Sequence, residues 1–253
     1  PYRGLRPWGL ELGPSSLQPR GENRSSVQLS GLGVRLAPLA SLRQGVLVLD
    51  LTARRGRAVL RPNARGQYWM LGPRRASQPA PRIDLLIRVP SPAMVEVEPN
   101  HSRWALSGDL QLHLHQRRLA LNAALRPGSS REREGLQLRA QGAWPKRHWD
   151  LQLNARRMPA ADLVALLPNR LAWRPPGLLS GSVALRWRQG LPACHGQVLV
   201  ERLQWHARDG LERAQLRCNG SLLSLDPATL RFGSWQGTAT AQARWLGGGD
   251  LEI

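Results

Sequence analysis

The sequence predicts an all-β protein: a long antiparallel sheet with one apolar and one polar face, and one or two short helices. Apolar and polar residues alternate along much of the chain, as in residues 110–115, 149–154 and 183–188. This two-residue period is typical of strands that face water on one side only. Turn-forming residues recur at intervals of roughly 10 to 15 residues, which favours antiparallel pairing of successive strands.

The first part of the chain, residues 1–73, is predicted to form an irregular β block. Residues 46–51 are apolar at nearly every position, which is typical of a strand covered on both faces, and a weak helix pattern covers residues 37–43. Residues 74–81 contain Pro79 and Pro81 and predict a linker or long loop, because proline cannot donate a hydrogen bond to a strand ladder. We expect residues 82–253 to form a second, more regular run of strands.

One segment of the second part, residues 159–167, predicts a helix. Pro159 suits a first helical turn, Asp162 complements the positive N-terminal end, and Pro168 ends the pattern. A helix this short is not stable alone. Its leucines are therefore expected to dock on an apolar end of the sheet.

The chain is strongly basic, with 36 Lys and Arg against 17 Asp and Glu and a net charge of +19. Lys146 is the only lysine, and the arginines are scattered in ones and twos, as expected when a GC-rich genome replaces lysine by arginine. The tryptophans alternate in register with Leu and Val, away from the arginines, whereas a base-stacking surface would place both on one face. The sequence therefore argues against nucleic-acid binding. Attraction of anionic headgroups to arginines at the rim of the sheet remains open.

No common catalytic motif occurs in the sequence, neither GxSxG nor HExxH nor a phosphate-binding glycine loop. We therefore predict a protein that is not an enzyme and needs no cofactor. His113 and His115 share one strand face, but no third ligand follows at a recognisable spacing, so we expect two solvated polar residues rather than a metal site.

The two cysteines, Cys194 and Cys218, fall on neighbouring predicted strands. A disulfide in an oxidising compartment and two half-buried thiols both remain open. The thiols are the favoured expectation.

Two stretches of the chain carry short motifs in a distinctive order. The first runs through the segment Trp8–Ser16 with its GPS turn, strands near residues 26–39 and 47–52, and a hairpin at 63–69. The second runs from about residue 136 to 253 and centres on MPAADLVALLP at 158–168. In these motifs the chain resembles the TamB family, the inner-membrane subunits of the translocation and assembly module, in which a helix similar to 158–168 is repeated. The likeness is closest to cyanobacterial members and their relatives in the chloroplast inner envelope.

The resemblance implies a sheet curled into a taco-like trough with an apolar concave face. It also implies a periplasmic segment of a longer, inner-membrane-anchored protein, with the anchor outside this chain. Such a protein is expected to carry phospholipid or another acyl lipid between inner and outer membranes, with an outer-membrane barrel assembly protein as partner. The alternative is a scaffold or chaperone arm that assists outer-membrane protein assembly by strand pairing.

The side chains expected to line the lipid groove are apolar residues of the alternating strands. They are Leu110, Leu112, Leu114, Leu136, Leu138, Trp149, Leu151, Leu153, Val183, Leu185 and Trp187. The same side chains would serve equally as the closed core of a sandwich, and that alternative remains open.

Overall fold

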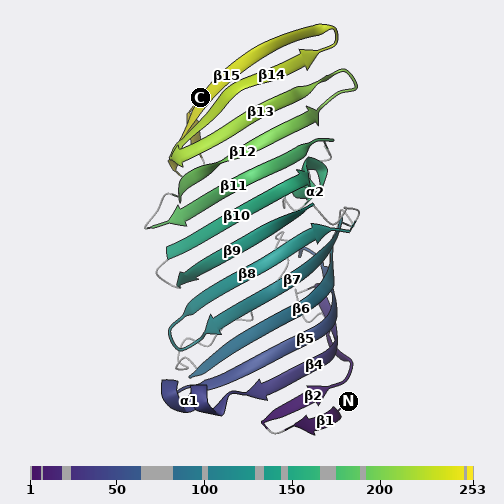
Figure 1. The fold of residues 1–253 in the computed structure, drawn as a ribbon, viewed down its shortest axis with the longest axis vertical. Coiled ribbons are helices and arrows are strands. Elements are labelled where there is room, and N and C mark those ends of the chain that lie inside the picture. The colour runs from purple at the N-terminus through teal and green to yellow at the C-terminus, as the bar shows by residue number, and fades with distance from the viewer. Residues whose placement is uncertain are drawn as a thin grey trace. The chain divides into compact units, whose positions relative to one another are not determined.

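The fold is known from a computed structural model, which describes residues 2–6, 8–18, 24–63, 82–98, 102–128, 134–143, 148–165, 175–188, 192–247 and 250–252. The chain divides into two compact units, Pro1–Ser129 and Ser130–Ile253. The division falls after Ser129, whereas the predicted linker at 74–81 lies outside the described residues. Strands make up most of both units, which confirms the predicted all-β class (Figure 1).

The first unit is an open sheet whose strands follow one another in the order β1-β2-β4-β5-β6-β7-β8, with the short β3 paired to β4. Its strands are β1 (Tyr2–Arg6), β2 (Gly9–Leu12), β3 (Ser15–Leu17), β4 (Ser26–Leu36), β5 (Leu47–Leu60), β6 (Ile83–Val97), β7 (Ser102–His113) and β8 (Arg118–Pro127). All but the first residue of the predicted segment 46–51 therefore belongs to a much longer strand, β5.

One neighbouring pair departs from the predicted antiparallel pattern, because β5 and β6 run parallel. Leu49 lies beside Leu85 and Leu51 beside Ile87. A parallel pair needs a connection of a dozen residues or more, and residues 61–82 are long enough to supply one. The strands on either side of the expected linker are thus direct neighbours in one sheet.

The long strands of the first unit curve toward one end (Figure 1). The pairing of β6 with β7 shifts between Val89 and Ala93, where Pro90 and Pro92 cannot donate ladder hydrogen bonds. Gly108 of β7 lies opposite Val89 with φ of 144°, and a Cβ there would collide with the backbone of β8. The bend therefore depends on residues that the alternating pattern alone does not mark.

The second unit is an open antiparallel meander in which each strand pairs with the next from β9 to β16. Its strands are β9 (Gly135–Ala143), β10 (His148–Pro159), β11 (Leu178–Trp187), β12 (Pro192–Gln204), β13 (Asp209–Gly220), β14 (Leu222–Phe232), β15 (Trp235–Gly247) and β16 (Asp250–Glu252). This regular order confirms the expected antiparallel run.

Two short helices accompany the strands, α1 (Pro38–Gln44) and α2 (Ala160–Ala165). They confirm the helices predicted over 37–43 and 159–167, although residues 166 and 167 lie outside the described part of the chain. α2 follows β10 directly, and the amide of Ala160 donates to the carbonyl of Gly177 just before β11 (3.0 Å). None of the described helices has the length and apolarity needed to cross a bilayer.

Candidate functional site

The candidate site in the second unit is the sheet face formed by every other residue of β9 to β13. Strand register places Leu138, Leu153 and Val183 in one row, Leu151 beside Leu185, and Trp149 beside Trp187. Leu136 continues the face through Ala155 toward Gly181 and Val198. The structure thus brings together all eight predicted groove residues of this unit on one side, which we call the second apolar face.

The opposite side of these strands is polar. Arg186 and Asp150 lie side by side, with 3.7 Å between their charged atoms, and Gln215 donates to Gln197 over 2.8 Å. Since polar contacts occupy one side and Leu, Val and Trp the other, the second unit has the amphipathic character that the alternation predicts.

The exposed fraction of each side chain tells whether the second apolar face is an open surface or a closed core. Met158, Val200 and Ala214 extend the second apolar face toward α2, and these side chains are 0%, 5% and 2% exposed. All eight predicted groove residues are instead half-buried, and Leu216 on the same face is 40% exposed. The face is closed near α2 and accessible over its middle.

The first unit carries a similar set of rows, which we call the first apolar face. Leu110 lies between Ile87 and Leu121, and Leu112 between Leu85 and Leu119. Leu110 and Leu112 are half-buried. Leu114 lies in the turn after β7, where its amide donates to the carbonyl of Ile83 over 3.2 Å, so it is not part of a strand row. Sequence reasoning missed the partners of Leu110 and Leu112 because register is not encoded in one strand alone.

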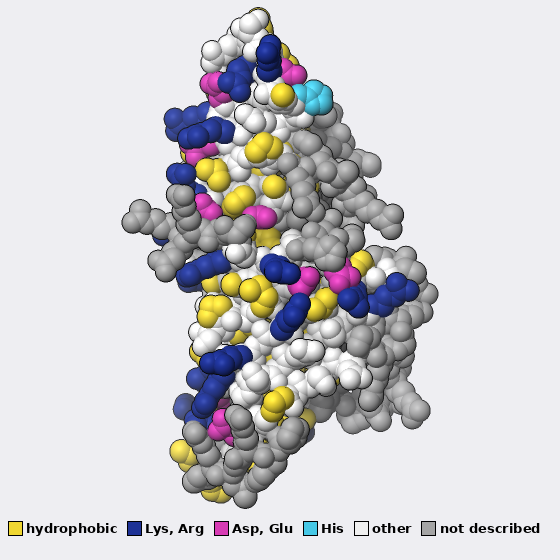
Figure 2. Space-filling view, turned by 90° about the vertical axis from the view of Figure 1, so that its right-hand side faces the viewer, with side chains coloured by type: hydrophobic (Ala, Val, Ile, Leu, Met, Phe, Trp, Pro, Cys, Tyr) yellow, Lys and Arg dark blue, Asp and Glu magenta, His cyan; other side chains and the backbone are white. Residues whose placement is uncertain are grey.

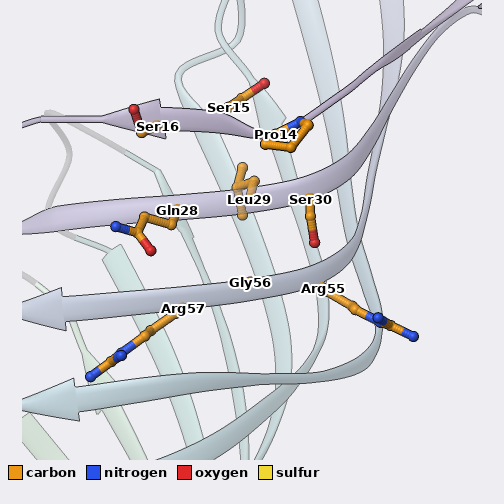
Figure 3. Close-up of a pocket in the computed structure, with 9 residues that line it drawn as sticks. All are labelled: Pro14, Ser15, Ser16, Gln28, Leu29, Ser30, Arg55, Gly56 and Arg57. Atoms are coloured by element: carbon orange, nitrogen blue, oxygen red, sulfur yellow. The ribbon is translucent and has the colours of Figure 1, made fainter. Parts of the chain in front are cut away.

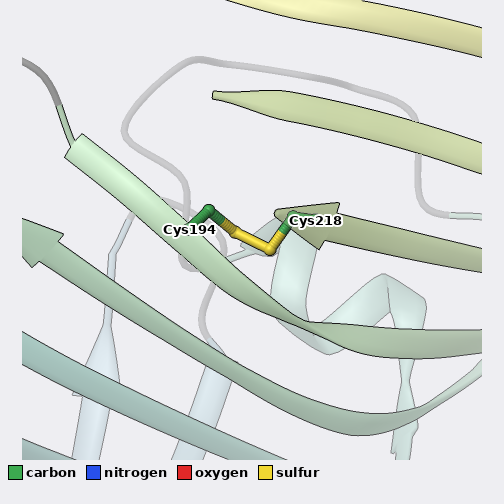
Figure 4. Close-up of a disulfide and its surroundings, with 2 residues drawn as sticks. All are labelled: Cys194 and Cys218. Carbon is green, nitrogen blue, oxygen red and sulfur yellow. A yellow bond between two sulfur atoms is a disulfide. The ribbon is translucent and has the colours of Figure 1, made fainter. Parts of the chain in front are cut away.

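A disulfide joins Cys194 of β12 to Cys218 of β13, with their Cα atoms 5.5 Å apart (Figure 4). Cys194 pairs with Gly220, and Cys218 pairs with Gly196. Because these positions alternate in step with Val198 and Val200, the bridge lies on the second apolar face. The favoured expectation of two half-buried thiols is therefore wrong.

His113 and His115 both contact a buried carboxylate, while their own side chains stay 36% and 25% exposed. Their Nδ1 atoms lie 2.7 and 2.8 Å from the two oxygens of Asp84, whose side chain is 8% exposed. A carboxylate only accepts hydrogen bonds, so each ring donates its Nδ1–H. The two polar, partly exposed histidines expected from the sequence thus share a partner that the spacing did not reveal, and with Asp84 they form a three-residue polar cluster. The part of the chain that the structure describes holds no group of three or more His, Cys, Asp or Glu arranged to bind a metal ion.

We expect Asp84→Asn to lower the free energy of unfolding by about 1–3 kcal/mol, because an amide nitrogen would replace one of the two acceptor oxygens. Urea unfolding followed by circular dichroism measures the change. Asp109→Asn is the matched control on β7, expected to stay within about 0.5 kcal/mol of the native protein. An equal loss in both variants would contradict a specific role for the cluster.

A hollow of about 410 Å³ lies between β3, β4 and β5 (Figure 3). Its polar groups do not converge: Arg55 and Arg57 point away from Ser15 and Ser16, and Arg57 is bonded to Glu96 over 3.0 Å. Basic side chains elsewhere are similarly dispersed, often beside acidic ones, over the side of the molecule in Figure 2. Neither feature is a concentrated anion-binding pocket.

No family model, curated protein or solved structure matches this chain. The likeness to the TamB family therefore stays a prediction.

Proposed function

We propose that this chain is a lipid-carrying segment of a longer envelope protein, in which acyl chains lie along its apolar faces. The observation that carries the proposal is the half-burial of Leu138, Leu151, Leu153, Val183 and Leu185 in continuous rows. A methylene group removed from water contributes about 0.8 kcal/mol. An acyl chain laid on these rows gains favourable contacts without any chemical step.

The chemistry of the face suits a sliding ligand rather than a fixed one. Aliphatic and aromatic side chains offer non-directional contacts, so a chain can move along the rows at little cost. The polar contacts described above occur on the opposite side, as between Arg186 and Asp150. Transport of this kind requires no catalytic residue and no cofactor.

The disulfide between Cys194 and Cys218 supports placement in an oxidising compartment such as the periplasm. Together with the likeness to the TamB family, this favours an intermembrane segment of an inner-membrane-anchored protein that works with an outer-membrane barrel partner. The alternative role is strand pairing with client outer-membrane proteins. It stays a prediction, because the contacts described above neither support nor oppose it.

The test is to purify the chain without detergent and look for bound phospholipid by native mass spectrometry. We expect lipid to accompany the native protein and to be lost, by about tenfold or more, from the variant Leu112→Asp with Leu151→Asp, because carboxylates on both apolar faces oppose acyl contact.

The matched control is Gln111→Asp with Gln152→Asp, which adds the same charges at exposed neighbours on the opposite faces. This control should keep its lipid, and both variants should keep a β-sheet circular dichroism spectrum. A native protein free of lipid, or a Leu variant that retains it, would overturn the proposal.

A further inference from the structure

One edge of the first unit combines exposed apolar and basic side chains. It comprises the β1–β2 turn, α1, the starts of β5 and β6, and the β7–β8 turn. We call it the α1 edge and define it by Trp8, Arg35, Leu39, Leu42, Arg43, Leu47, Arg82, Arg117 and Arg118.

Backbone hydrogen bonds place these elements side by side. The amide of Leu36 donates to the carbonyl of Trp8 over 2.8 Å, and the amide of Leu47 donates to the carbonyl of Arg82 over 2.9 Å. The amide of Leu114 donates to the carbonyl of Ile83, which joins the end of β7 to the start of β6. The turn after β7 leads into β8 at Arg118. The edge is therefore continuous from β2 to β8.

The helix α1 turns its leucines outward. Leu39 and Leu42 are 83% and 86% exposed, three positions apart and thus on one helix face, while α1 buries none of its residues. The helix is held by Ser41, whose hydroxyl donates to the carbonyl of Ala37 (2.8 Å) and accepts from the amide of Val48 (2.9 Å). Its position thus depends on polar bonds, and its apolar face is left available.

Trp8 adds a large aromatic group to the same edge. It is 67% exposed and holds a positive φ of 65° in the turn between β1 and β2. Tryptophan is enriched at membrane–water interfaces, because its ring is apolar while its N–H favours water. Leu47, 41% exposed, extends the apolar strip to β5.

The charge along this edge is positive. All five arginines of the α1 edge are exposed, and none of them forms an ion pair within the described residues. The carboxylates that follow in β5 and β6 are already engaged, Asp50 with Arg88 (3.1 Å) and Asp84 with the two histidines. An anionic surface would therefore meet unopposed guanidinium groups.

We propose that the α1 edge docks on the surface of an anionic phospholipid bilayer. Leu39, Leu42 and Trp8 enter the interface, while the arginines contact lipid phosphates. This proposal goes beyond lipid carriage and does not depend on it, since it concerns strand ends and not the apolar faces.

The test is flotation of the full chain with two kinds of vesicle: phosphatidylglycerol mixed with phosphatidylcholine, and phosphatidylcholine alone. We expect binding to the anionic vesicles, weakened by salt, and little binding to the neutral ones. Leu39→Asp with Leu42→Asp should reduce binding about tenfold or more. Arg43→Gln with Arg82→Gln should reduce it about fivefold for each charge removed.

Matched controls lie at the opposite end of the first unit, on β3, β6, β7 and β8. Leu17→Asp with Met94→Asp changes two exposed apolar residues outside the α1 edge, and Arg103→Gln with Arg126→Gln removes two exposed charges there. Both control variants should bind within about twofold of the native protein. Equal losses of binding in test and control variants would mean that vesicles attract the whole basic surface, and would overturn the proposal. Equal binding to anionic and neutral vesicles, or no binding to either, would overturn it as well.

A second readout does not depend on affinity. An environment-sensitive fluorophore on Leu39→Cys should shift to the blue with anionic vesicles, while one on Leu17→Cys should not; no shift at position 39 would overturn the proposal.

A dimer in sedimentation that dissociates in the Leu39/Leu42 variant would instead assign the edge to a second copy of this chain. The apolar-face variant, Leu112→Asp with Leu151→Asp, should still bind vesicles, which separates failure of docking from failure of lipid carriage.

Discussion

Replacing Trp104 by alanine is expected to lower the free energy of unfolding by about 3–5 kcal/mol, because this large side chain is 1% exposed and its loss leaves a cavity. In strand register Trp104 lies between Val95 of β6 and Pro127 of β8, close to the end of the first unit's longest strands. Urea unfolding followed by far-UV circular dichroism measures the effect.

Two variants show whether packing is the cause. The indole Nε1 of Trp104 has no hydrogen-bond partner among the described residues, so Trp104→Phe removes no observed bond and should cost far less than alanine, about 1–2 kcal/mol. Trp8→Ala, at a 67% exposed tryptophan, should stay within about 0.5 kcal/mol of the native protein. Similar losses in all three variants would contradict the packing argument.

Removing the disulfide by Cys194→Ser with Cys218→Ser is expected to lower the free energy of unfolding by about 3 kcal/mol. The two cysteines are 24 residues apart, and cross-linking a loop of this length restricts the unfolded chain by about that amount. Urea unfolding of the native protein with and without a phosphine reductant measures the same free-energy difference by a second route.

The serine variant supplies its own control, because reductant should leave its unfolding unchanged. If reduction frees both thiols of the native protein without moving its unfolding midpoint, the disulfide does not stabilise the second unit and the expectation is wrong. A stabilising bridge would also keep β12 and β13 in the register that aligns the second apolar face.

The sequence predicts local features of this fold well. Alternation assigned Leu110 and Leu112 to one side of β7, and Leu151 and Leu153 to one side of β10, where strand register places them. The proline-flanked segment 159–167 contains α2. These features are encoded within a few residues, since periodicity and helix ends depend on near neighbours.

Patterns within a few residues do not predict the features that join distant parts of the chain. Asp84 meets His113 and His115 from 29 and 31 positions away, and nothing in the spacing marks it as their partner. The disulfide depends on β12 and β13 being adjacent in one register. The half-burial of Leu151 and Leu185 likewise depends on which strands lie beside β10 and β11, and no single strand encodes that.

The parallel pairing of β5 with β6 bears on the order in which the first unit assembles. Antiparallel neighbours such as β7 and β8 are joined by a tight turn, so they can meet within microseconds. β5 and β6 meet only when the ends of the segment 61–82 come together, and closing a longer loop costs more chain entropy. We therefore expect the antiparallel pairs on either side to form first and the β5–β6 pair to form late, which leaves two strand edges open to a competing partner until then.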